Sequence, residues 1–225
     1  MRQFVPLVRF FVRQCDHPRP LSCELISSWL LRVANANHVS LADLLDGFGS
    51  QYPEVHLSGE LIDCSLSSAA FDALGRFCRV GKENIQALDL RKRIPLLNPA
   101  LVLRFSKANL MCPRRAHQRV RYAFCPLCLL TQQNIHIRWD WSLACLIRCS
   151  IHRVSLCDGC QDCGEPDPLP LSSSDLACRS CGGDLTQHQE RELEPEHYIH
   201  AIEDAYRVAL LGIAPHPSLL DWRQS

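Results

Sequence analysis

The sequence lacks any stretch suited to crossing a membrane. Its longest apolar runs, such as residues 100–103, fall far short of the roughly 20 residues that span a bilayer. Arg9 and Arg13 interrupt the apolar N-terminal residues, and no small-residue cleavage site follows, so no secretory signal is predicted. With 47% hydrophobic residues in 225 positions, the chain can pack one or two cores. We therefore expect a globular protein of the bacterial cytoplasm.

The motifs of two enzyme classes are also missing. There is no G-x-x-x-x-G-K-[ST] phosphate loop, so the chain is not expected to hydrolyse ATP itself. A zinc-dependent base deaminase needs a His-x-Glu before its Pro-Cys-x-x-Cys. The only His-x-Glu of the sequence, His188-Gln-Glu190, follows every Cys-x-x-Cys pair. We predict that the chain is not an enzyme.

Acidic residues are absent from Leu90 to Trp139, where ten basic residues occur. Such a block favours phosphate or an acidic partner, and the candidates for these contacts are Arg91, Lys92, Arg93, Arg114, Arg115, Arg119 and Arg121. The ordinary alternative is a solvated surface, because the sequence does not show whether these side chains share a face. The segment from Asp184 to Asp204 is acidic, so the net charge of zero conceals two regions of opposite sign.

Cysteine, in contrast, is abundant, with 14 residues. Without a secretory signal we expect reduced thiols rather than a disulfide framework. Eight ligand-type residues form four pairs of two-residue spacing: Cys125 and Cys128, Cys149 and His152, Cys160 and Cys163, and Cys178 and Cys181. Two such pairs complete the tetrahedron that Zn²⁺ adopts, and a site with four protein ligands leaves no position for water. The pattern predicts two structural zinc ions.

Two further cysteines leave the ligand sets open. Cys157 lies three residues before Cys160, and Cys145 lies four residues before Cys149, so either can replace a ligand of the four pairs. The other cysteines lack a partner at ligand spacing and are expected to be small buried apolar residues: Cys15, Cys23, Cys64, Cys78 and Cys112. Of the ten histidines, His152 alone has a ligand frame.

The first half of the chain has the periodicity of helices. Apolar residues at helical spacing predict a helix from Ser22 to the turn at 35–37, carrying Ile26, Trp29, Leu30 and Val33. Ser40-Leu-Ala-Asp43 is a capping box that opens a second helix through Leu45, and Gly47 and Gly49 are expected to end it.

A second helical pair is predicted further along the chain. Ser67 or Ser68 caps a helix that carries Phe71, Leu74, Phe77 and Cys78. A turn at Val80-Gly81 leads to a short helix from Lys82 to Leu88, with Ile85 and Leu88 facing inward. This is a helix-turn-helix in outline, although any compact helical domain joins its helices by short turns.

These patterns predict a mainly helical fold with small zinc-ribbon or zinc-finger β elements. We expect an extended arm over 1–20, a helix-turn-helix-like domain over 21–112, a first zinc finger over 113–156, a second zinc ribbon over 157–187, and an amphipathic helix and tail over 188–225. Between Cys128 and Cys149 we expect a strand or turn followed by a helix that packs against the helical domain. Trp29, Trp139 and Trp141 are expected in the core rather than stacked on bases.

Several segments together resemble the TniQ family of transposition proteins, which includes the TnsD-type target selectors. The resemblance covers about residues 18–186 and rests on Pro20, on Glu24-Leu-Ile-Ser-Ser-Trp-Leu-Leu-Arg-Val-Ala34, on Phe124-Cys-Pro-Leu-Cys-Leu129, on Arg138-x-x-Trp141, and on the pairs at 149–152, 160–164 and 178–182. Leu25 departs from the family, which usually has serine there, and this change can alter the cap of the first helix.

The resemblance implies a non-enzymatic adaptor with a helix-turn-helix and zinc fingers. Such proteins select the target of a transposon, through an attachment site on DNA or a CRISPR effector, and recruit an AAA+ regulator of the TnsC or TniB type. The ligand sets implied are Cys125, Cys128, Cys149 and His152 at one site, and Cys160, Cys163, Cys178 and Cys181 at the other. The chain is shorter than long family members, which favours the guide-dependent or minimal adaptor; truncation of a longer chain is the other option.

A function of another class stays open at this point. A zinc-containing transcription regulator would share the helices and the basic block, but it would bind an operator, normally as a dimer, and would need no ATPase. The sequence does not decide whether a target would be specified by DNA sequence or by guide RNA.

Overall fold

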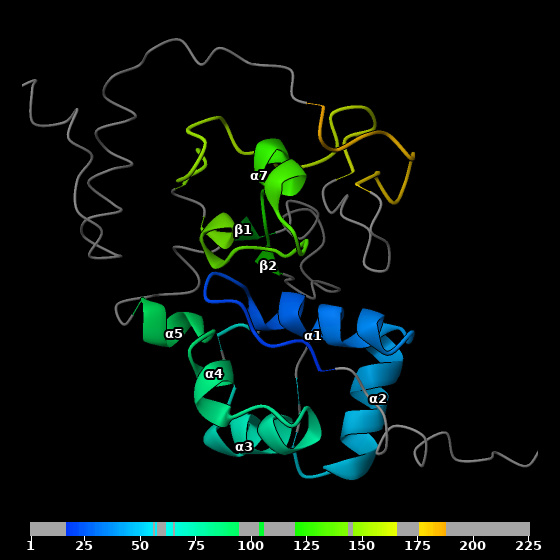
Figure 1. Cartoon of the computed structure of the whole chain (residues 1–225), viewed down its shortest axis with the longest axis vertical. Coiled ribbons are helices and arrows are strands. Elements are labelled where there is room, and N and C mark those ends of the chain that lie inside the picture. Colours follow the sequence, from blue (N-terminus) through cyan, green and yellow to red (C-terminus); the bar gives the residue numbers. More distant parts are fainter. Residues whose placement is uncertain are drawn as a thin grey trace, which may run out of the picture.

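The computed structural model describes residues 17–55, 57, 62–64, 66–94, 104–105, 120–143, 146–165 and 176–187, with the backbone alone at 104–105 and 120–121. In Figure 1, helices α1 to α5 form one half of the molecule, and α7, the strands β1 and β2 and the cysteine-rich segments form the other. The described residues are mostly helical with few strands, as the sequence predicts. Among them, no helix is both long enough and apolar enough to cross a membrane.

Helices α1 (Ile26–Ala36) and α2 (Leu41–Gln51) confirm the first predicted pair, but the predicted start at Ser22 is wrong, because Glu24 pairs with Arg138 and α1 begins only at Ile26. The apolar stripe of α1 is buried, including Trp29 at 0% exposure. Ser40 caps α2: its Oγ accepts a hydrogen bond from the Asp43 N–H at 3.0 Å, and its hydroxyl donates to Asp43 Oδ2 at 2.6 Å. The serine therefore makes the first bond of a capping box, to the Asp43 N–H, whereas the Asp43 carboxylate is bound to the serine hydroxyl.

The prediction that Gly47 and Gly49 end α2 is wrong, because the helix continues to Gln51. Each glycine costs about 1 kcal/mol relative to alanine inside a helix. Phe48 lies between them, is buried, and packs edge-on against Phe77 with ring centroids 5.4 Å apart. Burial of such a ring contributes about 1.5–3 kcal/mol, which offsets the two glycines.

Helices α3 (Ser68–Phe77) and α4 (Lys82–Gln86) confirm the second pair. Ser67 is the cap of α3, since its Oγ accepts from the Ala70 N–H at 3.1 Å. Ile85 and Leu88 are buried, as expected. The short helix α5 (Leu90–Arg93) follows and is capped by Asp89, whose carboxylate accepts from the Arg91 N–H at 3.0 Å. A role of α3 and α4 in reading DNA stays a prediction.

The start of α1 has an unusual cap. Leu25 stands at the N-cap position and offers no side-chain hydrogen bond, in line with the expectation that this residue alters the cap. Asp63, distant in sequence, replaces it: its carboxylate accepts from the Ser27 N–H and from the Ser27 hydroxyl, both at 2.8 Å. The carbonyl of Asp63 also accepts from Leu90 N at 3.0 Å. One buried residue therefore joins α1 to α5.

The buried apolar side chains of the described residues form two hydrophobic cores. One lies among α1 to α4 and includes Trp29, Phe48 and Leu74. The other surrounds the cysteine-rich segments, and Leu25, Leu90 and Ile94 of the predicted helical domain pack into it beside Phe124 and Trp141. The second core thus takes residues from both halves of the molecule.

Little regular structure occurs in the second half. Strands β1 (Arg104–Phe105) and β2 (Val120–Arg121) form an antiparallel pair, and α7 (Pro126–Thr131) is a single short helix. In the described residues between α7 and Cys149, the predicted helix is replaced by a 3-10 turn, η3 (Trp139–Ser142).

Tertiary hydrogen bonds hold residues 137–139, at the start of η3, in an extended conformation. Their backbone pairs with the residues before α1: Leu25 N donates to Ile137 O at 3.0 Å, Trp139 N donates to Cys23 O at 2.9 Å, and Glu24 and Arg138 form an antiparallel bridge. An extended backbone is needed for these bonds, so pairing outweighs helix propensity. The expected packing of this segment against the helical half is confirmed.

Other expectations fall on residues that the structure does not describe. These are most of the extended arm (residues 1–16), Cys15, Cys112, Cys145, and the C-terminal helix within 188–225. The boundaries of the five predicted regions stay predictions.

Candidate metal centres

The first group of ligand-type side chains brings together Cys125, Cys128, Cys149 and His152. Their ligand atoms all lie within 4.8 Å of one another. The Sγ atoms of Cys128 and Cys149 are 3.5 Å apart, and His152 Nδ1 lies 3.3 Å from the first and 3.8 Å from the second. Tetrahedral zinc with Zn–S of about 2.3 Å separates its ligands by roughly 3.4–3.8 Å. The group therefore has the size of a tetrahedral metal site.

A helix start positions the first two ligands. Cys125 is the N-cap of α7 and Pro126 is its first residue, the helical position where a missing N–H costs least. Cys128 lies one turn later, and its N–H donates to Cys125 Sγ at 3.4 Å. The sequence predicted a tight turn here, and the helix was not foreseen.

A hairpin turn holds the other two ligands of the first group. The Cys149 N–H donates to Val154 O at 2.8 Å, and the Arg153 N–H donates back to Cys149 O at 3.0 Å. Within the turn, the N–H groups of Ile151 and His152 both point at Cys149 Sγ, each at 3.4 Å. Such N–H donors stabilise a thiolate, the form of cysteine that binds metal.

The second group consists of Cys160, Cys163, Cys178 and Cys181, again with ligand atoms within 4.8 Å of one another. Sγ–Sγ distances are 3.6 Å from Cys160 to Cys181 and 3.7 Å from Cys163 to Cys178. Cys160 and Cys178 are buried, whereas the second cysteine of each pair is exposed. The two groups are thus of Cys₃His and Cys₄ composition, both suited to holding a metal ion.

Two turns of the same design build the second group. Gly164 N donates to Cys160 O at 2.9 Å, and Gly182 N donates to Cys178 O at 2.8 Å. Both glycines have positive φ, 71° and 75°. Arg153 occupies the matching place in the first group, directly after the second ligand, with a φ of 61°. This is the left-handed conformation that glycine adopts without strain.

The close thiols of the first group perturb each other's protonation. Hydrogen bonds from Cys125 and Cys128 lower the pKa of Cys149 below its ordinary value. The pKa of Cys128 is raised because it shares protons with Cys125 and Cys149 and is buried. Several thiolates in one small volume repel each other, and a bound cation relieves this repulsion. The donor set therefore fits a divalent, thiophilic metal.

Of the two alternative ligands, the structure describes Cys157 and not Cys145. Cys157 is not part of either group: its backbone pairs with Phe124 through two hydrogen bonds of 2.9 and 2.8 Å, and its sulfur accepts from Gln161 Nε2 at 3.4 Å. Cys145 lies outside the described residues. Each group holds four ligand-type side chains without them.

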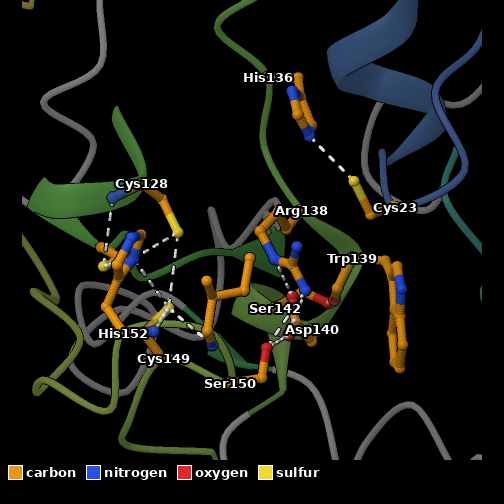
Figure 2. A network of polar contacts seen from close by, with 12 residues as sticks. Cys23, Cys128, His136, Arg138, Trp139, Asp140, Ser142, Cys149, Ser150 and His152 are labelled. Carbon is orange, nitrogen blue, oxygen red and sulfur yellow. Dashed lines mark hydrogen bonds and ion pairs between the residues drawn. The ribbon is translucent and has the colours of Figure 1, made fainter. Parts of the chain in front are cut away.

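A polar network ties the first group to its surroundings (Figure 2). Arg138 donates to both carboxylate oxygens of Asp140, from Nε at 2.9 Å and from Nη2 at 3.0 Å. Ser150, next to the ligand Cys149, donates from its hydroxyl to Asp140 Oδ2 at 3.0 Å. Arg138 therefore orients the turn that carries Cys149 and His152.

A second network joins Glu24, just before α1, to polar residues of that helix. Glu24 is fully buried, and Arg32 donates to its two oxygens, from Nε at 2.7 Å and from Nη2 at 2.6 Å. The Ser28 hydroxyl donates to the same carboxylate at 3.0 Å and accepts from the Ile137 N–H at 2.9 Å. Ser28 and Arg32, four residues apart, lie on one face of α1 and reach back to Glu24, which precedes the helix. Sequence reasoning noted the segment but missed the network.

The basic residues predicted to contact phosphate or an acidic partner differ in their exposure and in the contacts that the structure describes. Arg91 is exposed and donates to Leu66 O at 2.8 Å, and Lys92 is exposed and contacts Gln86 Oε1 at 2.9 Å. Arg93 is half-buried: it donates to Ser22 O at 2.6 Å and lies over the Trp139 ring, 5.5 Å from its centre. Arg121 belongs to β2, where only the backbone is described, and Arg114, Arg115 and Arg119 lie outside the described residues.

One pair was not foreseen from the sequence. Cys23 was expected to be a small buried apolar residue, but it is half-buried and its sulfur lies 3.1 Å from His136 Nε2. The two are separated by 113 positions, so no local spacing signals the contact. In contrast, Cys64 and Cys78 are buried, as predicted. Trp29 and Trp141 are in the core, and Trp139 packs against it.

Comparison with known proteins adds one match. The protein-family model described as TniQ matches residues 16–156, more than half of the 225 residues. The matched range contains the α1 network, the segment around Arg138 and all four residues of the first group. No curated protein matches the chain.

Proposed function

This chain belongs to the TniQ family of transposition-associated proteins, and from that premise we propose that it acts as a target-selection adaptor. In this role it links target DNA, or an RNA-guided CRISPR effector, to an AAA+ regulator of the TnsC or TniB type. The observation that carries the proposal is the family match over residues 16–156. We propose no catalytic step for the chain itself; the ATPase and the transposase are its partners.

We further propose that both cysteine groups hold structural zinc. Each group offers four protein side chains as ligands, so a tetrahedral ion bound there would have no open position for substrate. Zinc would supply the cross-links for segments that have little regular structure of their own, at about 10 kcal/mol of apparent binding energy per site. Reduced thiolates are required for this, which favours the cytoplasm as the place of action.

The way the two halves are joined supports an adaptor. Leu25, Leu90 and Ile94 extend the core around the metal groups, and backbone bonds connect Ile137 and Trp139 to the residues before α1. In this proposal, two surfaces of the joined halves would hold the two partners at the same time. This raises the effective concentration of one partner at the other without any new contact between them.

The exposed basic residues of α5 are the candidates for the nucleic-acid or effector contact. Lys92 is the most informative of them, because its described contact is a single bond to Gln86. Arg93 is a poorer test, since its loss would also remove the contacts with Ser22 and Trp139. We expect Lys92→Glu to weaken association with the targeting partner. Lys82→Glu, on α4 and also exposed, is the charge-reversal control, with its folding checked because the change removes the ion pair with Asp72.

Two measurements test the proposal. In a reconstituted transposition reaction, omission of the chain should abolish insertion at the selected target and leave transposase activity on other DNA. Purified AAA+ regulator should bind the chain in a pull-down, with or without DNA. If DNA is the other partner, log affinity should fall with log salt by about 0.9 per phosphate contact. Targeted insertion without the chain, or a regulator that neither binds it nor changes its assembly on DNA, would refute the proposal.

The zinc-containing helix-turn-helix transcription regulator is not favoured. It would explain the helices and the cysteine groups equally well, but the family that the chain belongs to is one of transposition. An operator-binding dimer that ignores the ATPase would be the result in its favour.

A further inference from the structure

Cys23 and His136 meet where the turn before α1 touches the segment that leads into η3. Figure 2 shows the His136 ring pointing at the Cys23 sulfur, away from the metal group. The distance from Sγ to Nε2 is 3.1 Å, within the range of a hydrogen bond to sulfur. The backbone of both residues is fixed nearby, because Cys23 O accepts from Trp139 N at 2.9 Å and His136 N donates to Gln132 Oε1 at 3.1 Å.

The other ring nitrogen defines the proton arrangement. His136 Nδ1 lies 2.8 Å from the carbonyl oxygen of Asn134, and a carbonyl only accepts, so Nδ1 carries a proton. Nε2 is then either the acceptor of the Cys23 S–H or, in the imidazolium, a donor to the thiolate. The second arrangement is the activated form of cysteine–histidine pairs.

The surrounding charges favour that form. Besides His136, the guanidinium groups of Arg93 and Arg138 act on Cys23, opposed by Asp140. The hydrogen bond from His136 is the main cause that lowers the pKa of the Cys23 thiol, against partial burial. Burial lowers the pKa of His136, but the hydrogen bonds to Cys23 and to the Asn134 carbonyl, with a smaller effect of the Glu24 charge, outweigh it and raise that pKa. Glu24 itself is paired with Arg32.

Among the described thiols outside the metal groups, Cys157 is half-buried like Cys23, whereas Cys64 and Cys78 provide an internal contrast. Cys64 is buried, and desolvation raises the pKa of its thiol to about 11. Cys78 is fully buried in the helical core. A reactive cysteine needs an electropositive, partly exposed position, and Cys23 has one, whereas Cys64 and Cys78 do not.

We propose that Cys23 is a site of covalent modification. Its thiolate is the nucleophile, and His136 is the proton donor. Its co-reactants are peroxides and soft alkylating electrophiles. With hydrogen peroxide, the thiolate attacks one oxygen, an S–O bond forms and the O–O bond breaks. Sulfur is oxidised to the sulfenic acid, and the departing hydroxide takes the proton from His136 Nε2 and leaves as water. This site is independent of the proposed targeting function.

The test uses the full chain with its metals bound. Iodoacetamide labelling of Cys23, followed by peptide mass spectrometry from pH 5 to 10, should give a rate midpoint below that of the same cysteine in the denatured protein. Cys64 and Cys78 should stay unlabelled in the folded sample. After a brief exposure to hydrogen peroxide, dimedone should add to Cys23, with the metal content unchanged.

The variant His136→Gln keeps a polar side chain near the sulfur without the positive charge. We expect it to lower the labelling rate at pH 7 by about threefold or more and to move the midpoint upward. Asp140→Asn, which removes a negative charge near the same thiol, should act in the opposite direction. A wild-type midpoint equal to that of the denatured protein would overturn the proposal even if neither variant folds, and so would dimedone addition at metal ligands without any at Cys23.

Discussion

The buried ion pair between Glu24 and Arg32 predicts how much stability is lost when one partner is removed. Glu24 is 0% exposed and accepts four hydrogen bonds, of which Arg32 donates two. The change Arg32→Met keeps most of the apolar stem but removes both of those bonds. The carboxylate then stays buried with only the Ser28 hydroxyl and the Leu21 N–H to compensate its charge.

The expected loss of stability is large. Removing one partner of a buried ion pair costs about 3–5 kcal/mol, because the other charge is left uncompensated. For a chain of this size, each kcal/mol lowers Tm by roughly 2–4 °C, so we expect a decrease of about 6–20 °C. The double variant Glu24→Gln with Arg32→Met removes the charge as well and should be more stable than the single variant.

Calorimetry or circular dichroism with excess zinc measures both effects. Lys82→Met is the matched control: Lys82 pairs with Asp72 at 2.9 Å, but both side chains are more than two-fifths exposed, and such surface pairs contribute little because water screens them. The reasoning is refuted if Arg32→Met costs no more than this control. It is equally refuted if the double variant is no more stable than the single one.

Three further predictions concern the metal groups and the cap of α1. Elemental analysis should give two zinc ions per chain, and Cys160→Ser should release the second, whereas Cys157→Ser should release neither; zinc loss in that variant would show that the ligand set is wrong. Arg153→Gly should raise the free energy of unfolding by about 0.5–1 kcal/mol, because its φ of 61° suits glycine; unchanged or lower stability in denaturant titration would contradict this. Burial is the main cause that raises the pKa of Asp63 above its ordinary 3.8. The folded state therefore keeps the Asp63 proton at pH values where the unfolded chain has lost it. The free energy of unfolding falls as pH rises from the unfolded pKa towards the folded one. Asp63→Asn should therefore gain stability relative to wild type from low pH upward in denaturant titrations, and a constant difference across pH would refute the sign.

Local signals account for most of what the sequence predicted correctly. The stripe of α1, the serine caps of α2 and α3 and the paired ligands of the metal groups all depend on residues within a few positions of each other. Helix periodicity, capping and ligand turns all depend on short-range interactions, so their patterns can be recognised in a single sequence. The same signals failed at Gly47 and Gly49, where the burial of Phe48 decided the outcome.

By itself the sequence predicted the mostly helical character of the described residues, the two groups of metal-ligand type formed by eight side chains at paired spacing, and the TniQ family, whose model matches residues 16–156. Only the tertiary structure decided how the halves join. Asp63 caps a helix far from it in sequence, Ile137 pairs with the start of α1, and Cys23 meets His136 across 113 positions. These contacts form because buried polar groups must find partners, and the partner is chosen by proximity in the fold and not along the chain.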